Sequence, residues 1–265
     1  MHFLNIASGS SGNATYIGSD DTHILVDCGV SCKKIVEGLD LLHLTIQDIK
    51  AILITHEHID HIKGLGVFLR KHPVPVYSTH GTINGILACD KLGELDGDLF
   101  KVIKPDISFQ IGDLNIEASS IWHDAADPVC YSVSDENGRA VVATDLGDYD
   151  EYLINKLSGA DCYLVESNHD VRMLEANQRY SWTLKQRILG RCGHLSNERS
   201  GEFMTEIVKK SPPKYIVLGH LSRDNNIPEC ALINMENYMR EAGVDLEKTK
   251  IFVASRTKPT AEVSI

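Results

Sequence analysis

The chain has 265 residues, of which 43% are hydrophobic and 24% charged, a composition typical of a soluble globular protein with a full core. No apolar run approaches the roughly 20 residues of a membrane span, and the N-terminus shows no signal-peptide plan. The net charge of −11 disfavours nucleic acid as a partner unless basic residues cluster locally. Seven cysteines, an odd number in a long chain, indicate reduced thiols, so we expect a cytoplasmic protein.

Strands and helices are predicted to alternate along the chain without a low-complexity linker, so we expect a single domain over residues 1–265. In the first half the predicted strands are 2–7, 14–18, 23–26, 51–55 and 74–77, with helices at 32–42, 62–71 and 82–90. Alternation broken by Pro and Gly-Asp predicts several antiparallel strands over 100–133. The Asn137–Gly138 turn leads to a strand at 140–144. The remaining predictions are strands at 162–166, 214–218 and 250–253, with helices near 170–175, 183–190, 196–210 and 229–241.

Several predicted strands end in similar strings. HILVDCG resembles AVVATDLG, while AILITHEHID resembles DCYLVESNHD and KYIVLGHLSRD. Each is an apolar strand followed by acids, amides or His. In open α/β sheets, sites form outside the carboxyl ends of the strands, so these side chains are expected on one rim. The repetition predicts two similar α/β halves, packed sheet to sheet with helices outside.

The segment AILITHEHIDH carries the strongest chemical signal. Its apolar part predicts a short buried strand, which is followed within six positions by four potential ligands, His56, His58, Asp60 and His61. In an extended loop the side chains of His56 and His58 point the same way, because the strand period is two. Imidazole nitrogens and a carboxylate are usual ligands of a borderline divalent ion such as Zn²⁺. The segment therefore predicts a metal site.

This HxHxDH string resembles the signature of the metallo-β-lactamase superfamily, which implies an α/β fold of the αβ/βα four-layer sandwich type. In that superfamily the first two His serve one metal, and the Asp and last His serve a second. The resemblance implies that His123 (in IWHDAADPVCY) joins the first ion and His220 (in YIVLGHLS) the second. It also implies that Asp145 (in VVATDLG) bridges them, because two dications about 3.5–4 Å apart repel.

Two points about the metal centre depend on chemistry rather than on the string itself. Asp27, which ends ILVDCG, is better placed to orient a ligand His than to bind a metal. The two divalent ions are expected to be zinc or manganese, with iron also open, because sites of this kind accept all three.

Further segments point to a narrower group. They are SGSSGN at 8–13, THEHIDHIKGLG at 55–66, HDAADP at 123–128, VESNHDVRML at 165–174, RYSWTLKQRILGRCGHLSNE at 179–198 and LGHLSRDNN at 218–226. Together they resemble the WalJ (YycJ) family of small bacterial metallo-β-lactamase-fold proteins, over residues 2 to about 230. That resemblance implies a DNA 5′→3′ exonuclease.

Candidate substrate contacts fall in the same segments. The predicted helix after Ser181 has a cationic side, on which Lys185 and Arg187 could meet backbone phosphates, although a solvated basic face is the alternative. Tyr180 and Trp182 could stack on a terminal base, but core packing is the more usual place for a Trp. The turn with Ser10 and Asn13 could present N–H groups to a phosphate or be a plain tight turn. The other candidate contacts are Asn168 and Asn225.

We interpret the chain as a metal-dependent phosphodiesterase, specifically a DNA 5′→3′ exonuclease acting through a hydroxide that the metal pair activates and Asp60 holds. The resemblance to related enzymes of the fold implies that His194, in GRCGHLSNE, protonates the leaving oxygen and that Glu166 orients His194. A His that only fills the loop is the alternative.

A glyoxalase II-like or lactonase-like hydrolase of thioesters or lactones would use the same ligands but would not need the basic helix. A binding module that kept the fold is disfavoured because no ligand is missing. DNA ends are the expected partner, and no association with a membrane is expected. The preference for DNA over RNA and any protein partners stay open.

Overall fold

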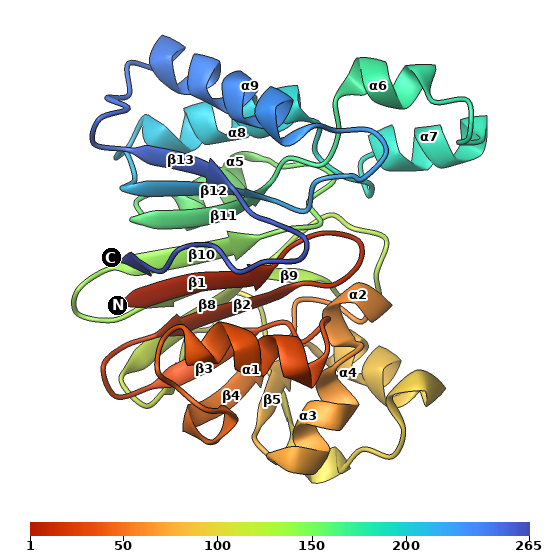
Figure 1. Ribbon diagram of the computed structural model, residues 1–265, viewed down its shortest axis with the longest axis vertical. Coiled ribbons are helices and arrows are strands. Elements are labelled where there is room, and N and C mark those ends of the chain that lie inside the picture. The colour runs from red at the N-terminus through yellow and green to blue at the C-terminus, as the bar shows by residue number, and fades with distance from the viewer. The chain divides into compact units, whose positions relative to one another are not determined.

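The computed structural model describes residues 1–265 and divides into two units by internal contacts (Figure 1). Unit 1 comprises Met1–Ser120, Ala125–Gly138 and Ser255–Ile265, and unit 2 comprises Ile121–Asp124 and Arg139–Ala254. Two units of this kind do not decide how many domains fold independently, so the single domain over 1–265 stays a prediction.

Unit 1 is built on a seven-stranded sheet with the order β14-β1-β2-β3-β4-β5-β6. The bounds are β1 (His2–Ala7), β2 (Ala14–Gly18), β3 (His23–Val26), β4 (Ile49–Leu53), β5 (Val76–Ser78), β6 (Phe100–Val102) and β14 (Val263–Ser264). The β14–β1, β1–β2 and β2–β3 pairs are antiparallel, whereas β3 to β6 run parallel. The carboxyl ends of β3, β4 and β5 therefore meet at one edge of the sheet.

A second, antiparallel set of strands covers part of this sheet. It consists of β7 (Phe109–Ile111), β8 (Leu114–Ser120) and β9 (Val129–Ser134). The Tyr131 hydroxyl of β9 donates to the carbonyl of Ile54 at 3.0 Å, and Tyr77 stacks on Phe109 with ring centroids 5.1 Å apart. These contacts pack the two strand layers of unit 1 together.

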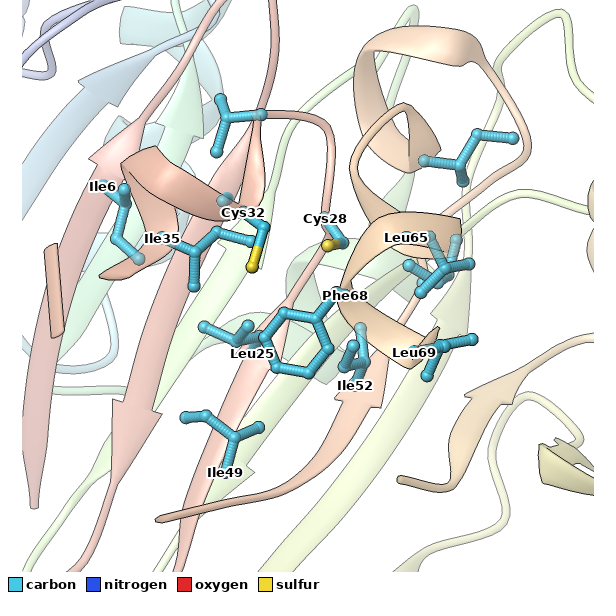
Figure 2. Close-up of a cluster of buried hydrophobic side chains, with 14 of the residues drawn as sticks. Ile6, Leu25, Cys28, Cys32, Ile35, Ile49, Ile52, Leu65, Phe68 and Leu69 are labelled. Atoms are coloured by element: carbon cyan, nitrogen blue, oxygen red, sulfur yellow. The ribbon is translucent and has the colours of Figure 1, made fainter. Parts of the chain in front are cut away.

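Helices cover the opposite face of the large sheet. They are α1 (Cys32–Asp40), α2 (Ile59–Ile62), α3 (Leu65–Lys71) and α4 (His80–Leu87). Figure 2 shows Ile35 of α1 and Phe68 of α3 over Leu25 and Ile52 of the sheet, all of them fully buried. Burying a side chain of this size contributes about 1.5–3 kcal/mol, so this cluster holds the strands that end at the site.

Unit 2 carries a parallel sheet in the order β10-β11-β12-β13. Its strands are β10 (Arg139–Ala143), β11 (Cys162–Glu166), β12 (Tyr215–Gly219) and β13 (Lys250–Val253), and its helices are α5 (Glu151–Leu157), α6 (Val171–Ala176), α7 (Trp182–Leu189), α8 (Asn197–Val208) and α9 (Pro228–Glu241). The apolar strands are the kind that parallel sheets bury, and α8 and α9 pack together beside them (Figure 1). Because the strands are parallel, the residues that follow them share one edge.

Most predicted elements are confirmed within a few residues, and the exceptions have physical causes. The predicted helix 62–71 is two helices, α2 and α3, which meet at Gly64, where a side chain would meet the Val30 carbonyl oxygen at 1.9 Å. The antiparallel prediction for 100–133 is wrong at its first strand, since β6 runs parallel to β5. The chain returns between these two strands through helix α4, which is how parallel neighbours are joined.

Two further features bear on the expectations from composition. All seven cysteines are free thiols, as the sequence predicted. None of the helices combines the length and the apolar character that crossing a bilayer would require.

Candidate metal centre

Three of the predicted site residues follow strand ends in a left-handed backbone conformation. Asp27 comes directly after β3 with φ 64°, Asp145 lies two residues after β10 with φ 57°, and His220 comes directly after β12 with φ 53°. This conformation costs a residue with a side chain roughly 1–2 kcal/mol. Such strain is kept where the position of a side chain matters, which indicates functional strand ends in both units.

In unit 1 the structure brings the four residues of the HxHxDH string together. The ring centroid of His56 lies 4.6 Å from that of His58 and 4.1 Å from that of His61. The Asp60 carboxylate is 3.7 Å from Nε2 of His61. His58 directly precedes α2, and Asp60 and His61 belong to that helix. The short helix therefore folds the last two potential ligands back toward the first two.

A single buried carboxylate orients two of these imidazoles. Asp27 accepts from Nδ1 of His61 at 2.8 Å and from the Thr55 hydroxyl at 3.0 Å. A carboxylate only accepts, so Nδ1 of His61 carries the hydrogen and Nε2 carries the lone pair. The Thr55 hydrogen is directed to Asp27, so its oxygen accepts from Nδ1 of His56 at 3.0 Å, which leaves Nε2 of His56 as a donor to a metal as well.

Asn13 connects the SGSSGN turn to this ligand loop. Its Oδ1 accepts from the Gly9 N–H at 2.8 Å, which fixes the amide so that its NH₂ group lies 2.9 Å from Nε2 of His61 and 3.4 Å from the Asp60 carboxylate. The Asn13 N–H also donates to the Asp60 carbonyl at 2.8 Å. These contacts are internal, whereas Ser10 is exposed. Substrate binding by Ser10 and Asn13 stays a prediction.

In unit 2 the corresponding carboxylate is Glu166, at the end of β11 and fully buried. Its Oε1 accepts from Nδ1 of His194 at 2.8 Å and from Nδ1 of His220 at 2.9 Å. Its Oε2 accepts from the backbone N–H groups of Leu146 at 2.9 Å and Leu195 at 3.2 Å. Burial alone would raise the pKa of Glu166, but the charges and hydrogen bonds of the two imidazoles outweigh it and lower that pKa.

Asp145 lies between two predicted ligands of different ions. Its Oδ1 is 3.1 Å from Nδ1 of His220 and 3.8 Å from Nε2 of His123. Nδ1 of His123 donates to the Gly193 carbonyl at 3.2 Å, so its Nε2 carries the lone pair. The potential ligand atoms of Asp145, Glu166, His194 and His220 all lie within 4.8 Å of one another. Neutral imidazoles and a carboxylate, already oriented, suit a divalent cation.

His194 differs from the other histidines of unit 2 in its exposure. Its side chain is 22% exposed, against 4% for His220 and 2% for His123. Burial would lower the pKa of His194, but Glu166 and Asp145 outweigh burial and raise it. With Nδ1 on Glu166, the other ring nitrogen is the one that can meet a substrate.

The other predicted substrate contacts have partners inside unit 2. Asn168 donates to the His220 carbonyl at 2.8 Å, and Asn225, 1% exposed, accepts from Asn177 at 2.6 Å. Lys185 donates to the Glu175 carbonyl at 2.6 Å, and Arg187 forms an ion pair with Asp124 while 62% exposed. Substrate binding by these four residues, Asn168, Asn225, Lys185 and Arg187, stays a prediction.

One expectation for this region is wrong. Core packing was the more usual place for Trp182, but its side chain is 74% exposed. The reason is that α7 has no buried residue at all and so offers no core to enter. The other aromatic candidate for stacking, Tyr180, is half-buried and lies 3.4 Å from the Asp224 carboxylate.

Comparison with known proteins gives this arrangement its class. Residues 7–220 match the family model of the metallo-beta-lactamase superfamily. The metallo-beta-lactamase fold protein YhfI from Bacillus subtilis aligns with a TM-score of 0.68 at 17% identity, covering 98% of this chain and 100% of that one. Human tRNase Z, short form, aligns with a TM-score of 0.65 at 16% identity over the whole of both chains. The predicted α/β fold class of the metallo-β-lactamase sandwich is thus confirmed.

Relatives closer in sequence narrow the class. Exodeoxyribonuclease YycJ of Bacillus anthracis is 37% identical over 243 residues, which are 92% of this chain and 90% of the relative. Exodeoxyribonuclease WalJ of Streptococcus pneumoniae is 39% identical over 246 residues, 91% of each. The chain belongs to the YycJ and WalJ family of the metallo-β-lactamase superfamily, as its sequence motifs predicted.

Proposed function

We propose that this protein is a metal-dependent DNA 5′→3′ exonuclease. Its relatives YycJ and WalJ are named exodeoxyribonucleases and share more than a third of its residues over nine-tenths of the chain. The observation that carries the proposal is the Glu166–His194 pair at 2.8 Å. Breaking a phosphodiester expels a sugar alkoxide, which needs a proton, whereas a thioester expels a thiolate that does not. An oriented imidazole beside the ligand cluster therefore favours phosphodiesters over thioesters.

The metal ligands are proposed from family membership and from the oriented donors described above. His56, His58 and His123 would hold one ion, Asp60, His61 and His220 the other, and Asp145 would bridge them. When bound, the ions would lower the pKa of a water molecule and offset the charge that develops on the phosphate. We propose zinc or manganese, with iron as the third candidate.

The chain's own residues would do the remaining work. Asp60 would orient the attacking water through its carboxylate. Asp27 and Glu166 would keep Nδ1 of the ligand histidines protonated, so that Nε2 faces the metal. His194, whose pKa Glu166 helps to raise, would donate a proton to the leaving oxygen near neutral pH, an effect typically worth 10²–10⁴-fold.

The direct test is an end-labelled degradation assay. Purified, metal-loaded protein is incubated with DNA and RNA that carry the label at the 5′ or the 3′ end, in parallel with a panel of thioesters and lactones. We expect nucleotides to be released from DNA 5′ ends. Brisk thioester or lactone turnover with intact DNA ends would instead establish the alternative hydrolase.

His194→Ala separates a proton donor from a structural residue. The variant should bind both metals, lose most DNA cleavage, and largely retain hydrolysis of a nitrophenyl phosphodiester, whose leaving group needs no acid. Elemental analysis and both assays are made on the same preparation. Equal losses on the two substrates, or loss of metal, would show that His194 fills a structural or ligand role.

Lys185 and Arg187 are proposed as phosphate contacts from the side of the basic helix. The logarithm of the DNA-binding constant falls linearly with the logarithm of the salt concentration. Replacing both residues by Ala should make this slope shallower by roughly 0.7–0.9 for each phosphate that the variant no longer neutralises. An unchanged slope would mean that their intramolecular partners, the Glu175 carbonyl and Asp124, are their only ones. We also propose a cytoplasmic location, which the seven free thiols support.

A further inference from the structure

The segment 170–193, here called the arm, leaves the sheet of unit 2 between two site residues. It begins four residues after Glu166, contains α6 and α7, and ends directly before His194. Figure 1 shows α6 and α7 as a helical pair that stands out from the α8–α9 layer of the same unit. A molecule that binds to the arm would therefore lie on a segment whose two ends are joined to the cluster of potential ligands.

The arm presents an aromatic ring that the protein itself does not cover. Trp182, in the first turn of α7, is 74% exposed, the highest value among the large exposed hydrophobic side chains. Leu189, at the other end of the same helix, is 40% exposed. A Trp that only stabilised the fold would be buried, so this position points to an external partner with a flat apolar face.

The charge of the arm indicates what kind of partner that is. The segment has five basic and two acidic residues, a net charge of +3 in a chain whose net charge is −11. The basic residues are Arg172, Arg179, Lys185, Arg187 and Arg191. Three of their side chains are strongly exposed, at 72% for Arg179 and 62% for both Arg187 and Arg191, and each pairs with one carboxylate outside the arm, for which a phosphate could substitute: Asp224, Asp124 and Asp148 respectively. A positive segment with an exposed aromatic ring suits an anionic chain of stackable groups.

Polar contacts seat the arm next to the residues that flank His123. Arg187 pairs with Asp124, and the guanidinium of Arg191 lies 4.0 Å from the ring centroid of Trp122. At the base, Asn177 donates to Asn225 at 2.6 Å. The arm therefore contacts two loops that carry predicted ligands. Trp182 lies about one and a half turns of α7 before Arg187, so its position is fixed by these contacts.

We propose that the arm binds single-stranded nucleic acid, with Trp182 stacked on a base and the exposed arginines along the backbone. The inference rests on the proposed function and adds to it the kind of end that the enzyme holds. In a duplex only the outer face of the last base pair is free for stacking, whereas every base of a single strand can offer a face, and stacking on an aromatic side chain is tolerant of sequence. The arm would then deliver an unpaired strand, rather than a blunt duplex end, to the cluster.

The test measures binding rather than cleavage. Fluorescence anisotropy is recorded for the metal-loaded protein with a short labelled oligothymidylate that has phosphorothioate linkages, and with a blunt duplex. Trp182→Ala should weaken binding of the single strand by roughly five- to 150-fold, the effect of losing one stacked base, and change duplex binding little. Trp182→Phe should restore most of the affinity. Ile233→Ala on α9, which removes a side chain 58% exposed, is the matched control and should bind as the parent protein does.

Intrinsic fluorescence provides a second readout that a structural role would not move. Of the two tryptophans, Trp122 lies under Arg191 and only Trp182 is open to a base. The oligonucleotide should quench the parent protein and leave Trp182→Phe unquenched although it still binds. Unchanged affinity in Trp182→Ala, or an equal loss in Ile233→Ala, would overturn the proposal.

The outcomes for the arm and for the proposed function are separable. A protein that degrades DNA ends but binds the oligonucleotide independently of Trp182 keeps its proposed function and loses this inference. If the protein binds single strands through Trp182 but cuts no DNA, the inference about the arm stands and the proposed nuclease function fails.

Discussion

The two units use the same device, one buried carboxylate that fixes two imidazoles, but they build it differently. In unit 1, Asp27 bonds one imidazole directly, that of His61, and reaches His56 through the Thr55 hydroxyl. In unit 2, one oxygen of Glu166 accepts from both His194 and His220. The first arrangement is a relay and the second is a shared acceptor.

The difference follows from where the histidines come from. His56 and His61 belong to one loop and the short helix after it, so the backbone already spaces them and the carboxylate only has to set the ring tautomers. His194 and His220 come from segments 26 positions apart, and Glu166 is the group that both rings contact. Side chains that come together from distant segments therefore depend more heavily on the acid that both of them contact.

Glu166→Ala is expected to have the largest effect. It removes the partner of two imidazoles and leaves the N–H groups of Leu146 and Leu195 without their acceptor, at about 1–3 kcal/mol for each buried donor left unsatisfied. Metal affinity should fall 10- to 100-fold, near the upper end, because the proposed ligand His220 is not held within a helical turn as His61 is, and because Leu146, which Glu166 also holds, directly follows the proposed bridge Asp145. Calorimetric titration with Zn²⁺ and thermal unfolding measure the two effects. Glu166→Gln keeps the side-chain volume, so it should restore more of the lost thermal stability than of the lost metal affinity. Unchanged metal affinity in both variants would contradict the orienting role of Glu166.

Asp27→Ala should cost less in metal affinity, about tenfold, because only His61 loses a direct partner and its place in the α2 turn is kept. The same titration provides the measurement. Asp27→Asn is the control, since its amide oxygen can still accept from the Thr55 N–H although the side chain no longer carries a negative charge. If Asp27→Ala equals or exceeds Glu166→Ala in lost affinity, the contrast between relay and shared acceptor is mistaken.

Thr55 isolates the relay. Thr55→Val keeps the shape but removes the hydroxyl between Asp27 and His56, and a hydrogen bond of this kind is worth about 0.5–1.5 kcal/mol. Metal affinity should therefore fall about two- to twelvefold. Thr55→Ser retains the hydroxyl and should bind metal like the parent protein. A Ser variant as weak as the Val variant would show that packing of the methyl group matters, and not the relay.

The smallest effects are expected at the asparagines that brace each unit. Asn168→Ala removes a bond to the His220 carbonyl, and Asn13→Ala removes those to Asp60 and His61. Each should lower the free energy of unfolding by about 1 kcal/mol, with Asn13→Ala the more harmful to metal affinity because its amide and its backbone N–H hold the proposed ligand Asp60. Chemical denaturation and metal titration distinguish the two. Larger losses for Asn168→Ala would reverse this order.

Much of the site could be predicted from the sequence because its key residues are contiguous or follow apolar strands. The HxHxDH string needs no tertiary information, since His56 to His61 are held by their own loop. Asp145 and His220 follow buried parallel strands, whose ends must share an edge. Glu166 could be paired with His194 only through the resemblance to related proteins, and its second bond, to His220, was not predicted.

What could not be predicted depends on distances between segments. Nothing local indicates that the Thr55 hydroxyl lies between an acid 28 positions earlier and the next His, or that the Asn13 amide lies against His61 and Asp60. The parallel direction of β6 depends on the helix before it. The exposure of Trp182 could not be inferred either, because an amphipathic pattern does not say whether a core lies opposite the helix.

The left-handed backbone at Asp27, Asp145 and His220 has a consequence for heat resistance. Each position holds a strained residue whose side chain is proposed to serve the site, so the protein gives up stability where it places these side chains. Glycine adopts the same conformation without strain, and Asp145→Gly also removes a buried carboxylate that lies beside Glu166. Without metal, the Asp145→Gly variant should therefore unfold at a higher temperature than the metal-free parent, although it lacks the carboxylate that we propose as the bridge. Selection for thermal stability alone would erode this site, and selection for activity keeps the fold below the stability that it could reach.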